Sequence, residues 1–342
     1  MAVEKPEKEQ WKQLVEAALR IRQMAPWEWM TETDIFGVRD PASGDIGFVS
    51  TMGYLGEHLG ISLYLGIPAL AAMMDLHFLP PRTLQEYPEK LVEIPQLQVS
   101  FEDRNILGDW DRKLLRNLGV KVRGRQAWPF FQSFRPGFMP WRPETDEIRV
   151  LTTAPEQLED VAPRVLIDRS LLAFDGTGRC LVRAQGKNNE WEDLNETIPP
   201  PGPQQFLLQF DAADLDRLHR VPRGSDILEV DFFMFPGAIG KRTERPRTAY
   251  VFLALHQQTN TMLCVEVLHV KDTLEEMWGR LAGILLAQLA SMGMRPAEIH
   301  VKNPLLLYLL PHLFEKLGTR VVEKKSLKQM KKAKRHMERF LL

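Results

Sequence analysis

Apolar and polar residues follow two different periods in the first part of the chain. Between residues 7 and 24, apolar side chains recur at helical spacing, which predicts an amphipathic helix. Residues 34–50 then alternate around a Pro-Ala-Ser-Gly turn, which is typical of a β-hairpin. The pattern predicts further strands at 60–66, 97–101 and 120–124, and helices at 67–79 and 109–119. The expected order is β-β-β-α-β-α-β.

The second half of the chain shows the same order of elements. A hairpin is expected at 249–270, followed by a long helix at 274–293 that Thr273 can cap. A strand at 298–303, a helix at 304–318 and a strand at 319–323 complete the set, and residues 227–235 can add a strand before it. This order is the one expected for a ribonuclease-H-like domain.

The two halves can be compared through their hairpins. Residues 38–49 align with residues 254–265 without a gap, and both have a polar turn. An internal duplication would explain the match, but hairpins also resemble one another because their turns need the same chemistry. Both explanations stay open at the level of sequence.

A proline-rich stretch near the middle of the chain separates the halves. The sequence "IPPPGPQQ" at 198–205 cannot continue a helix or a central strand. We therefore expect an N-terminal α/β domain at 1–144, a connector with a hairpin at 145–203, and a ribonuclease-H-like domain with a basic terminal helix at 204–342. The fold class is α/β with mixed sheets.

Composition and charge fit an ordinary globular protein. The chain is 44% hydrophobic and 26% charged, and 44 basic residues against 45 acidic ones give a net charge of −1. Cys180 and Cys264 are its two cysteines, without the spacing of a zinc site. The charged N-terminus and the short apolar runs predict a cytoplasmic protein without a membrane segment. No cofactor is expected.

Several segments resemble an uncharacterised bacterial family. The similarity lies in residues 25–66, in "SFEDR" (100–104), and in residues 109–124 and 127–141. Members of that family have two consecutive domains of unknown function, and some add a SEC-C zinc-binding tail. This chain lacks the cysteines for such a tail. The resemblance implies a two-domain organisation and no particular activity.

A metal-dependent nuclease of this fold needs carboxylates on the first and fourth strands of its sheet. In the second half these positions are read as His256 and Lys302 or Asn303, so we expect no metal ligands there. In the first half, Asp40 and Asp103 take the two positions. A hydrolase or nuclease using Mg²⁺ or Mn²⁺ at these carboxylates is the alternative function, although Asp40 also suits a turn.

His58 is a further candidate for catalysis. It follows Glu57 between two glycines, and a histidine beside an acid can serve as a general base. An ordinary loop histidine explains the pattern equally, since neighbouring residues on a strand point to opposite faces.

Aromatic and arginine residues alternate in an unusual stretch at 120–142. Aromatic rings can stack on bases while guanidinium groups hold phosphates, so this stretch suits a single-stranded nucleic acid. An extended segment buried in the core is the competing interpretation. The candidate binding residues are Arg123, Arg125, Trp128, Phe131 and Arg135.

The C-terminal stretch is strongly basic. Between residues 324 and 335 the chain has basic residues and no acidic one, and an apolar stripe runs beside them with a gap at Lys334. A helix of this kind can contact phosphates or an acidic partner, or it can simply dock with a solvated charged face. The candidates are Lys324, Lys328, Lys331, Lys332 and Arg335.

Taken together, these patterns predict a non-enzymatic binding or scaffold protein. Its expected partner is a nucleic acid or another protein, bound through the aromatic–arginine stretch and the basic C-terminal helix. The patterns do not predict an oligomeric state.

Overall fold

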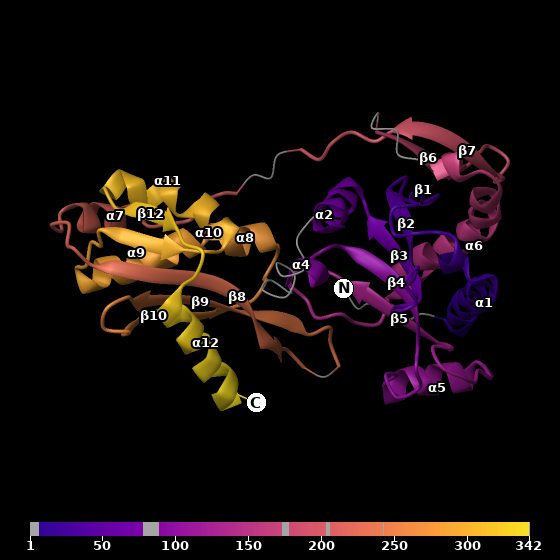
Figure 1. Cartoon of the computed structure of the whole chain (residues 1–342), viewed down its shortest axis with the longest axis horizontal. Coiled ribbons are helices and arrows are strands. Elements are labelled where there is room, and N and C mark those ends of the chain that lie inside the picture. The colour runs from indigo at the N-terminus through magenta and orange to yellow at the C-terminus, as the bar shows by residue number, and fades with distance from the viewer. Residues whose placement is uncertain (1–6, 78–88, 173–177, 203–205, 242, 342) are drawn as a thin grey trace. The chain divides into compact units, whose positions relative to one another are not determined.

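The computed structural model describes residues 7–77, 89–172, 178–202, 206–241 and 243–341. The α/β class is confirmed, because the chain forms helices and two mixed sheets. It divides into two compact units. The described residues within Met1–Leu84, Lys90–Arg135 and Pro140–Gly202 form the first unit, and those within Gln85–Glu89, Pro136–Met139 and Pro203–Leu342 form the second (Figure 1).

The first unit is built on a seven-stranded sheet in the order β5-β4-β3-β2-β1-β6-β7. Neighbouring strands are antiparallel except β1 and β6, which are parallel. The strands are β1 (Phe36–Arg39), β2 (Ile46–Met52), β3 (Gly60–Leu65), β4 (Gln96–Glu102), β5 (Trp128–Phe134), β6 (Arg179–Gln185) and β7 (Trp191–Thr197).

Helices cover both faces of this sheet. Apolar residues of α1 (Lys8–Met24) and α6 (Thr145–Ile167) pack with one face of the strands into the main core. Helix α2 (Ile67–His77) packs on the other face, where Met73 contacts a smaller cluster around Phe48 and Tyr64. The remaining helices are α4 (Glu89–Val92), α5 (Asp109–Asn117), η1 (Pro26–Glu28) and η2 (Arg169–Leu172).

Two features of the first unit differ from the sequence predictions. The strand expected at 120–124 is wrong, because these residues form a loop and the strand is the aromatic stretch at Trp128–Phe134. The segment 145–203, expected as a connector, contributes α6, β6 and β7 to the first unit, the last two as the expected hairpin. Part of the helix expected at 67–79 lies outside the described residues.

The second unit contains a five-stranded sheet in the order β10-β9-β8-β11-β12. Strands β8, β9 and β10 are antiparallel, whereas β11 is parallel to β8 and β12 is parallel to β11. The strands are β8 (Ile227–Ile239), β9 (Arg247–His256), β10 (Met262–Leu268), β11 (Glu298–Val301) and β12 (Arg320–Glu323).

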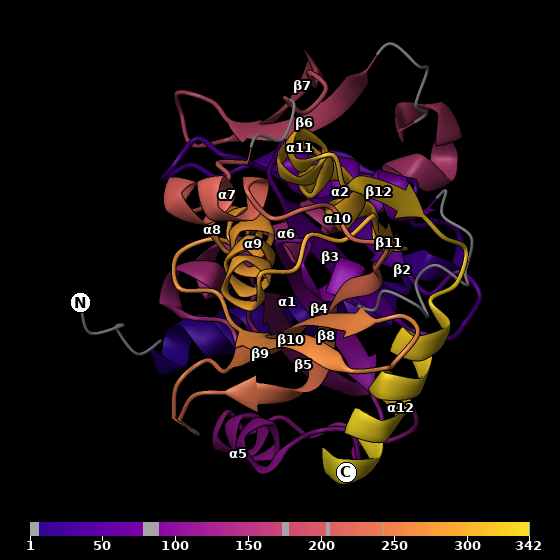
Figure 2. The ribbon, with the colours of Figure 1, turned by 90° about the vertical axis from the view of Figure 1, so that its left-hand side faces the viewer.

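Helices α9 and α12 lie on opposite sides of this sheet (Figures 1 and 2). Leu285 and Leu289 of α9 belong to the main core of the unit, whereas Met330 of α12 packs on β9. Among the described residues, no helix is both long and apolar enough to span a membrane. The helices are α7 (Ala212–His219), α8 (Leu274–Gly279), α9 (Leu281–Met292), α10 (Pro304–Leu309), α11 (Pro311–Phe314), η3 (Glu315–Leu317) and α12 (Lys328–Leu341).

Two glycines let an extended segment lie directly against α8 and α9. The amide of Gln209 donates a 2.9 Å hydrogen bond to the carbonyl oxygen of Gly279. A Cβ atom on Gly283 would lie 2.1 Å from the carbonyl oxygen of Gln209. Only glycine therefore permits this close backbone approach.

The strand order also bears on the alignment of the two hairpins. Strand β1 lies between antiparallel β2 and parallel β6, and β8 lies likewise between β9 and β11. By position in the sheet, β1–β2 therefore corresponds to β8–β9. The gap-free alignment instead pairs β1–β2 with β9–β10, so it matches strands that occupy different places.

Candidate functional site

The basic C-terminal helix α12 is docked on the sheet of the second unit. Leu327, Met330 and Ala333 are buried against Val251 and Leu253 of β9 and their neighbours. This burial uses the apolar stripe that the sequence shows. The stripe fixes which side of α12 faces the sheet, and so which side faces outward.

Two carboxylates of β8 hold the same helix. Glu229 accepts a 2.8 Å hydrogen bond from the backbone amide of Met330, in the first turn of α12. Asp231 forms a 2.6 Å ion pair with Lys334. Residues two apart on a strand share a face, so both acids point toward α12. Lys334 also lies 3.9 Å from the centroid of the Phe233 ring, on that same face.

The environment of Asp231 is unusual for a carboxylate. Burial raises the pKa of Asp231, and the positive charge of Lys334 offsets part of that effect. A buried carboxylate without a partner would be strongly destabilising. Lys334, the gap in the apolar stripe, therefore serves as the partner of a buried acid rather than as part of the exposed surface.

The outward side of α12 carries exposed cations. Lys328, Lys331, Lys332 and Arg335 are exposed, and none of them forms an ion pair with the residues that the structure describes. We call these four residues the basic face. Lys324, the fifth predicted candidate, is half-buried, and its amide donates to the carbonyl oxygen of Val301. It is therefore anchored at the base of the helix.

The aromatic–arginine stretch does not form one surface. Side chains alternate between the core and the outside along β5, and Phe131 is only 4% exposed in the main core. Phe131 is thus unavailable for stacking on a base, which corrects the prediction. Trp128 is half-buried, with the guanidinium of Arg104 5.8 Å from its ring centroid.

The arginines of that stretch lie at opposite ends of β5. Arg123 and Arg125 are exposed in the loop before the strand. Arg135 follows the strand and forms ion pairs with Glu144 at 2.7 Å and Glu147 at 2.9 Å. Although burial opposes the charged form, these acids raise the pKa of Arg135. Arg135 is therefore a structural residue and not a free phosphate ligand.

A different arginine lies against two tryptophan rings. The guanidinium of Arg142 lies 5.1 Å from the ring centroids of both Trp110 and Trp141. These residues line a small cleft with Phe130 and Asp111, and burial raises the pKa of Asp111. Trp110 comes from α5, outside the stretch singled out in the sequence, so no local pattern could have linked it to Arg142.

Asp40 and Asp103 are not brought together. Asp40 follows β1 and Asp103 follows β4. Three antiparallel pairings separate these strands, so β1 and β4 run in opposite directions and their C-terminal ends lie at opposite ends of the sheet. Arg149 binds both oxygens of Asp40, one at 2.9 Å, and lowers the pKa of that carboxyl. Asp103 accepts a hydrogen bond from the amide of Gln126. The geometry contradicts a joint metal site for these two acids.

The predicted catalytic histidine has a different partner from the one expected. His58 lies 3.5 Å from Glu102, at the end of β4, and its neighbour Glu57 contributes only a backbone contact to Gln126. Among the described residues, no group of three or more His, Cys, Asp or Glu side chains is placed to hold a metal ion. The His58–Glu102 pair lies at the end of β4, with His58 more exposed than Glu102.

The nuclease positions of the second unit also need correction. His256 ends β9, the second strand, where it pairs with Asp226 at 3.0 Å. The first strand is β8, which carries Glu229 and Asp231. The predicted positions are wrong because β8, which the pattern places before the expected order, is itself the first strand. Asn303, after β11, donates to the carbonyl oxygen of Phe232 and caps α10.

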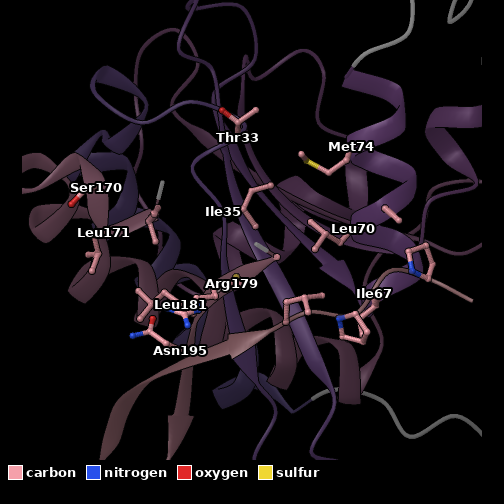
Figure 3. Close-up of a pocket in the computed structure, with 17 residues that line it drawn as sticks. Thr33, Ile35, Ile67, Leu70, Met74, Ser170, Leu171, Arg179, Leu181 and Asn195 are labelled. Carbon is pink, nitrogen blue, oxygen red and sulfur yellow. Dashed lines mark hydrogen bonds between the residues drawn. The ribbon is translucent and has the colours of Figure 1, made fainter. Parts of the chain in front are cut away.

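A pocket of about 390 Å³ opens within the first unit (Figure 3). Its walls come from α2, η2, the β6–β7 hairpin and the residues before β1. Ile35, Leu70 and Met74 contribute apolar surface, whereas Arg179 and Asn195 contribute polar groups. No local sequence pattern predicts this pocket, because its lining residues are widely separated in the chain.

The chain was compared with curated proteins and with solved structures. No curated protein matches. One solved structure with similarity is the cryo-EM structure of the simian T-cell lymphotropic virus intasome in complex with PP2A regulatory subunit B56 gamma, at 16% identity and a TM-score of 0.24. The match covers 35% of this chain and 44% of that chain, so it spans less than half of its length. A likeness at this level establishes neither fold nor function.

Family models describe both halves of the chain. The model of DUF6930, a domain of unknown function, matches residues 214–338. The expected succession of two domains of unknown function is confirmed, because a second model matches the preceding half. That model is DUF7309, likewise a domain of unknown function; it matches residues 11–183, more than half of the 342 residues, and the chain belongs to this family.

Proposed function

We propose that this protein is a non-enzymatic binding module that recognises the phosphate backbone of nucleic acid through the basic face of α12. The supporting observation is the contrast between the two sides of the helix. Lys334 is used inside to neutralise Asp231, whereas Lys328, Lys331, Lys332 and Arg335 stay exposed without acidic partners among the described residues. Exposed cations held on a fixed helix are suited to contact phosphates.

The strand order of the second unit supports a ribonuclease-H-like fold as part of this proposal. Three antiparallel strands are followed by two parallel ones, with the first strand at the centre. Both carboxylates of that strand are engaged by α12, Asp231 by Lys334 and Glu229 by the amide of Met330. Both polar atoms of the Asn303 side chain are also hydrogen-bonded. Because these side chains are already engaged by protein groups, the arrangement favours binding over metal-dependent hydrolysis.

The proposal has a quantitative consequence. If all four cations of the basic face contact phosphates of a duplex, the logarithm of the binding constant falls with the logarithm of salt with a slope of about −3.6. Raising salt from about 50 to about 200 mM then weakens binding by roughly 150-fold. A protein partner bound through apolar contacts would show no such dependence.

The test is a salt titration of fluorescence anisotropy with short single- and double-stranded DNA and RNA. We expect steep salt dependence in the natural protein, and weak binding with a shallow slope when the four basic-face residues are replaced by Gln. The matched control replaces Arg220, Lys241, Lys271 and Lys316, four exposed basic residues elsewhere in the second unit, by Gln. Its binding should remain close to that of the natural protein.

Three outcomes of the binding assay would overturn the proposal. They are absence of nucleic-acid binding, equal losses in the two quadruple variants, and loss only after Arg123→Ala and Arg125→Ala. Repeating the assay with Mg²⁺ or Mn²⁺ tests for hydrolysis, and metal-dependent cleavage would also contradict a non-enzymatic role.

A further inference from the structure

We propose that the pocket of the first unit binds a small carboxylate with an apolar body, of the size of a medium-chain fatty acid. This site is separate from the basic face of α12, and nothing in it depends on nucleic acid. The inference rests on the shape of the pocket, on the chemistry of its walls and on one cation at its edge (Figure 3).

The interior of the pocket is apolar. Leu70 and Met74 present one side of α2 to the space, and Leu171 of η2 and Ile35 line other walls. Burying an alkyl chain against such walls contributes about 0.8 kcal/mol for each methylene group. A ligand that fills the pocket therefore needs an extended apolar portion.

Arg179 and Asn195 lie on the β6–β7 hairpin, whereas the hydroxyls of Thr33 and Ser170 line other parts of the pocket. Leu181 pairs directly with Asn195 across the two strands, and Arg179 is two residues before Leu181, so all three lie on one face of the hairpin. Figure 3 shows Arg179, Leu181 and Asn195 grouped at one side of the pocket. A guanidinium beside an amide can hold both oxygens of a carboxylate.

Charge complementarity selects an anion. Arg179 is exposed and forms no ion pair with any residue that the structure describes. None of the described residues that line the pocket is an Asp or a Glu. A carboxylate can form charge-assisted hydrogen bonds with this guanidinium, which are stronger than those of a neutral head group, whereas a cationic head group would be repelled.

The volume sets the size of the ligand. Water occupies about 30 Å³ per molecule in the liquid, so 390 Å³ corresponds to roughly 13 such volumes. A carboxylic acid of about ten to twelve carbon atoms has a similar number of non-hydrogen atoms. The space also falls within the usual range for small-molecule sites, about 300–1,000 Å³.

The opposite face of β6 contributes a thiol to the pocket, which bears on covalent chemistry. Cys180 lines the pocket, and burial raises its pKa to about 11. The thiol is therefore protonated at neutral pH and is a poor nucleophile. Binding is thus expected to be reversible and non-covalent.

The experiment compares decanoate with decanol by isothermal titration calorimetry on the full chain. We expect decanoate to bind at least tenfold more tightly than decanol, because only the acid engages Arg179. Arg179→Gln should weaken decanoate about tenfold and leave decanol unchanged. Arg169→Gln is the matched control, since Arg169 is an exposed arginine of η2 that does not line the pocket.

A second variant tests the apolar part independently. Met74→Trp places a larger side chain in the space and should abolish binding of both ligands, with circular dichroism to verify that the variant is folded. The inference is overturned if decanoate does not bind, if decanol binds equally well, or if Arg169→Gln weakens binding as much as Arg179→Gln. It is also overturned if folded Met74→Trp still binds decanoate as before.

Discussion

The ammonium group of Lys334 on α12 lies 2.6 Å from a carboxylate oxygen of Asp231 on β8. Asp231 is only 6% exposed, in the strand at the centre of the sheet of the second unit. The pair joins a helix to a strand far from it in the chain. It also decides which lysine of a strongly basic helix is withheld from the surface.

Replacing Lys334 by Met should lower the free energy of unfolding of the second unit by about 3 kcal/mol, because it leaves the Asp231 carboxylate buried without a partner. Removing the cation also raises the pKa of Asp231 further. When the pKa of a carboxyl is higher in the folded state than in the unfolded state, the protein loses stability as the pH rises through the folded pKa. The loss in the free energy of unfolding caused by Lys334→Met should therefore shrink toward acidic pH, where Asp231 is protonated. Urea denaturation, with hydrogen exchange of α12 to assign the transition, measures the change.

The control for this pair is the double variant Asp231→Leu with Lys334→Met. Exchanging a buried ion pair for apolar side chains is often neutral or stabilising, so this variant should lie within about 2 kcal/mol of the natural protein. A double variant that is less stable than Lys334→Met alone would show that the pair is not the main role of these residues.

Asp40→Asn should lower the free energy of unfolding by about 1 kcal/mol at neutral pH, since the ion pair with Arg149 lies near the surface. Arg149 lowers the pKa of Asp40 in the folded state. Its contribution is therefore present above the unfolded pKa of about 4 and is lost as the pH falls through the folded pKa.

The difference in stability between the natural protein and Asp40→Asn should accordingly be constant above about pH 5 and shrink below about pH 4. Arg149→Gln should reproduce this profile, because it removes the other member of the pair. A difference that grows on acidification would contradict the assignment of the shift to Arg149.

Both cysteines should react slowly with thiol reagents. Burial raises the pKa of Cys180 and that of Cys264 to about 11. At pH 8 such a thiol is about 0.1% ionised, against about a quarter for an ordinary thiol of pKa 8.5. We expect alkylation by iodoacetamide to be about 100-fold slower than for the urea-unfolded chain, measured by mass spectrometry. Equal rates in the two states would refute this prediction.

Gly283→Ala should destabilise the second unit by about 1–3 kcal/mol, because the new methyl group would collide with the backbone of the segment that crosses α9. The added carbon would lie 2.1 Å from the carbonyl oxygen of Gln209. Thermal denaturation measures the loss. Gly237→Ala is the control, since its nearest contact of 3.5 Å is ordinary and it should be tolerated. Similar losses of thermal stability in both variants would contradict the proposed collision at Gly283.

Local patterns predicted the elements whose burial is one-sided. The helix at Lys8–Met24 has its buried residues at helical spacing, and the hairpin of β1 and β2 turns where the Pro-Ala-Ser-Gly sequence predicts. In such elements the period of the sequence is the period of the buried face. Strand β5 was missed because aromatic residues lie on both of its faces, which hides the alternation.

The candidate site was less predictable, because its decisive contacts join distant residues. Glu229 and Asp231 look unsuited to a central strand, and Lys334 looks like a defect in an apolar stripe. The acids of β8 explain Lys334, and α12 explains the acids, only when the helix is known to dock on β8. Two alternating acids in a strand and one lysine in an apolar helix face are together a signal for such docking.

The docking of α12 on β8 has a consequence for the order in which the protein can mature. The amide of Met330 and the carboxylate of Glu229 are 101 residues apart, and α12 follows all five strands in the chain. During synthesis from the N-terminus, the face of the sheet that carries Glu229 and Asp231 remains uncovered until α12 has emerged from the ribosome. The second unit therefore cannot close over β8 until α12 is in place, and the same helix brings the cations of the basic face.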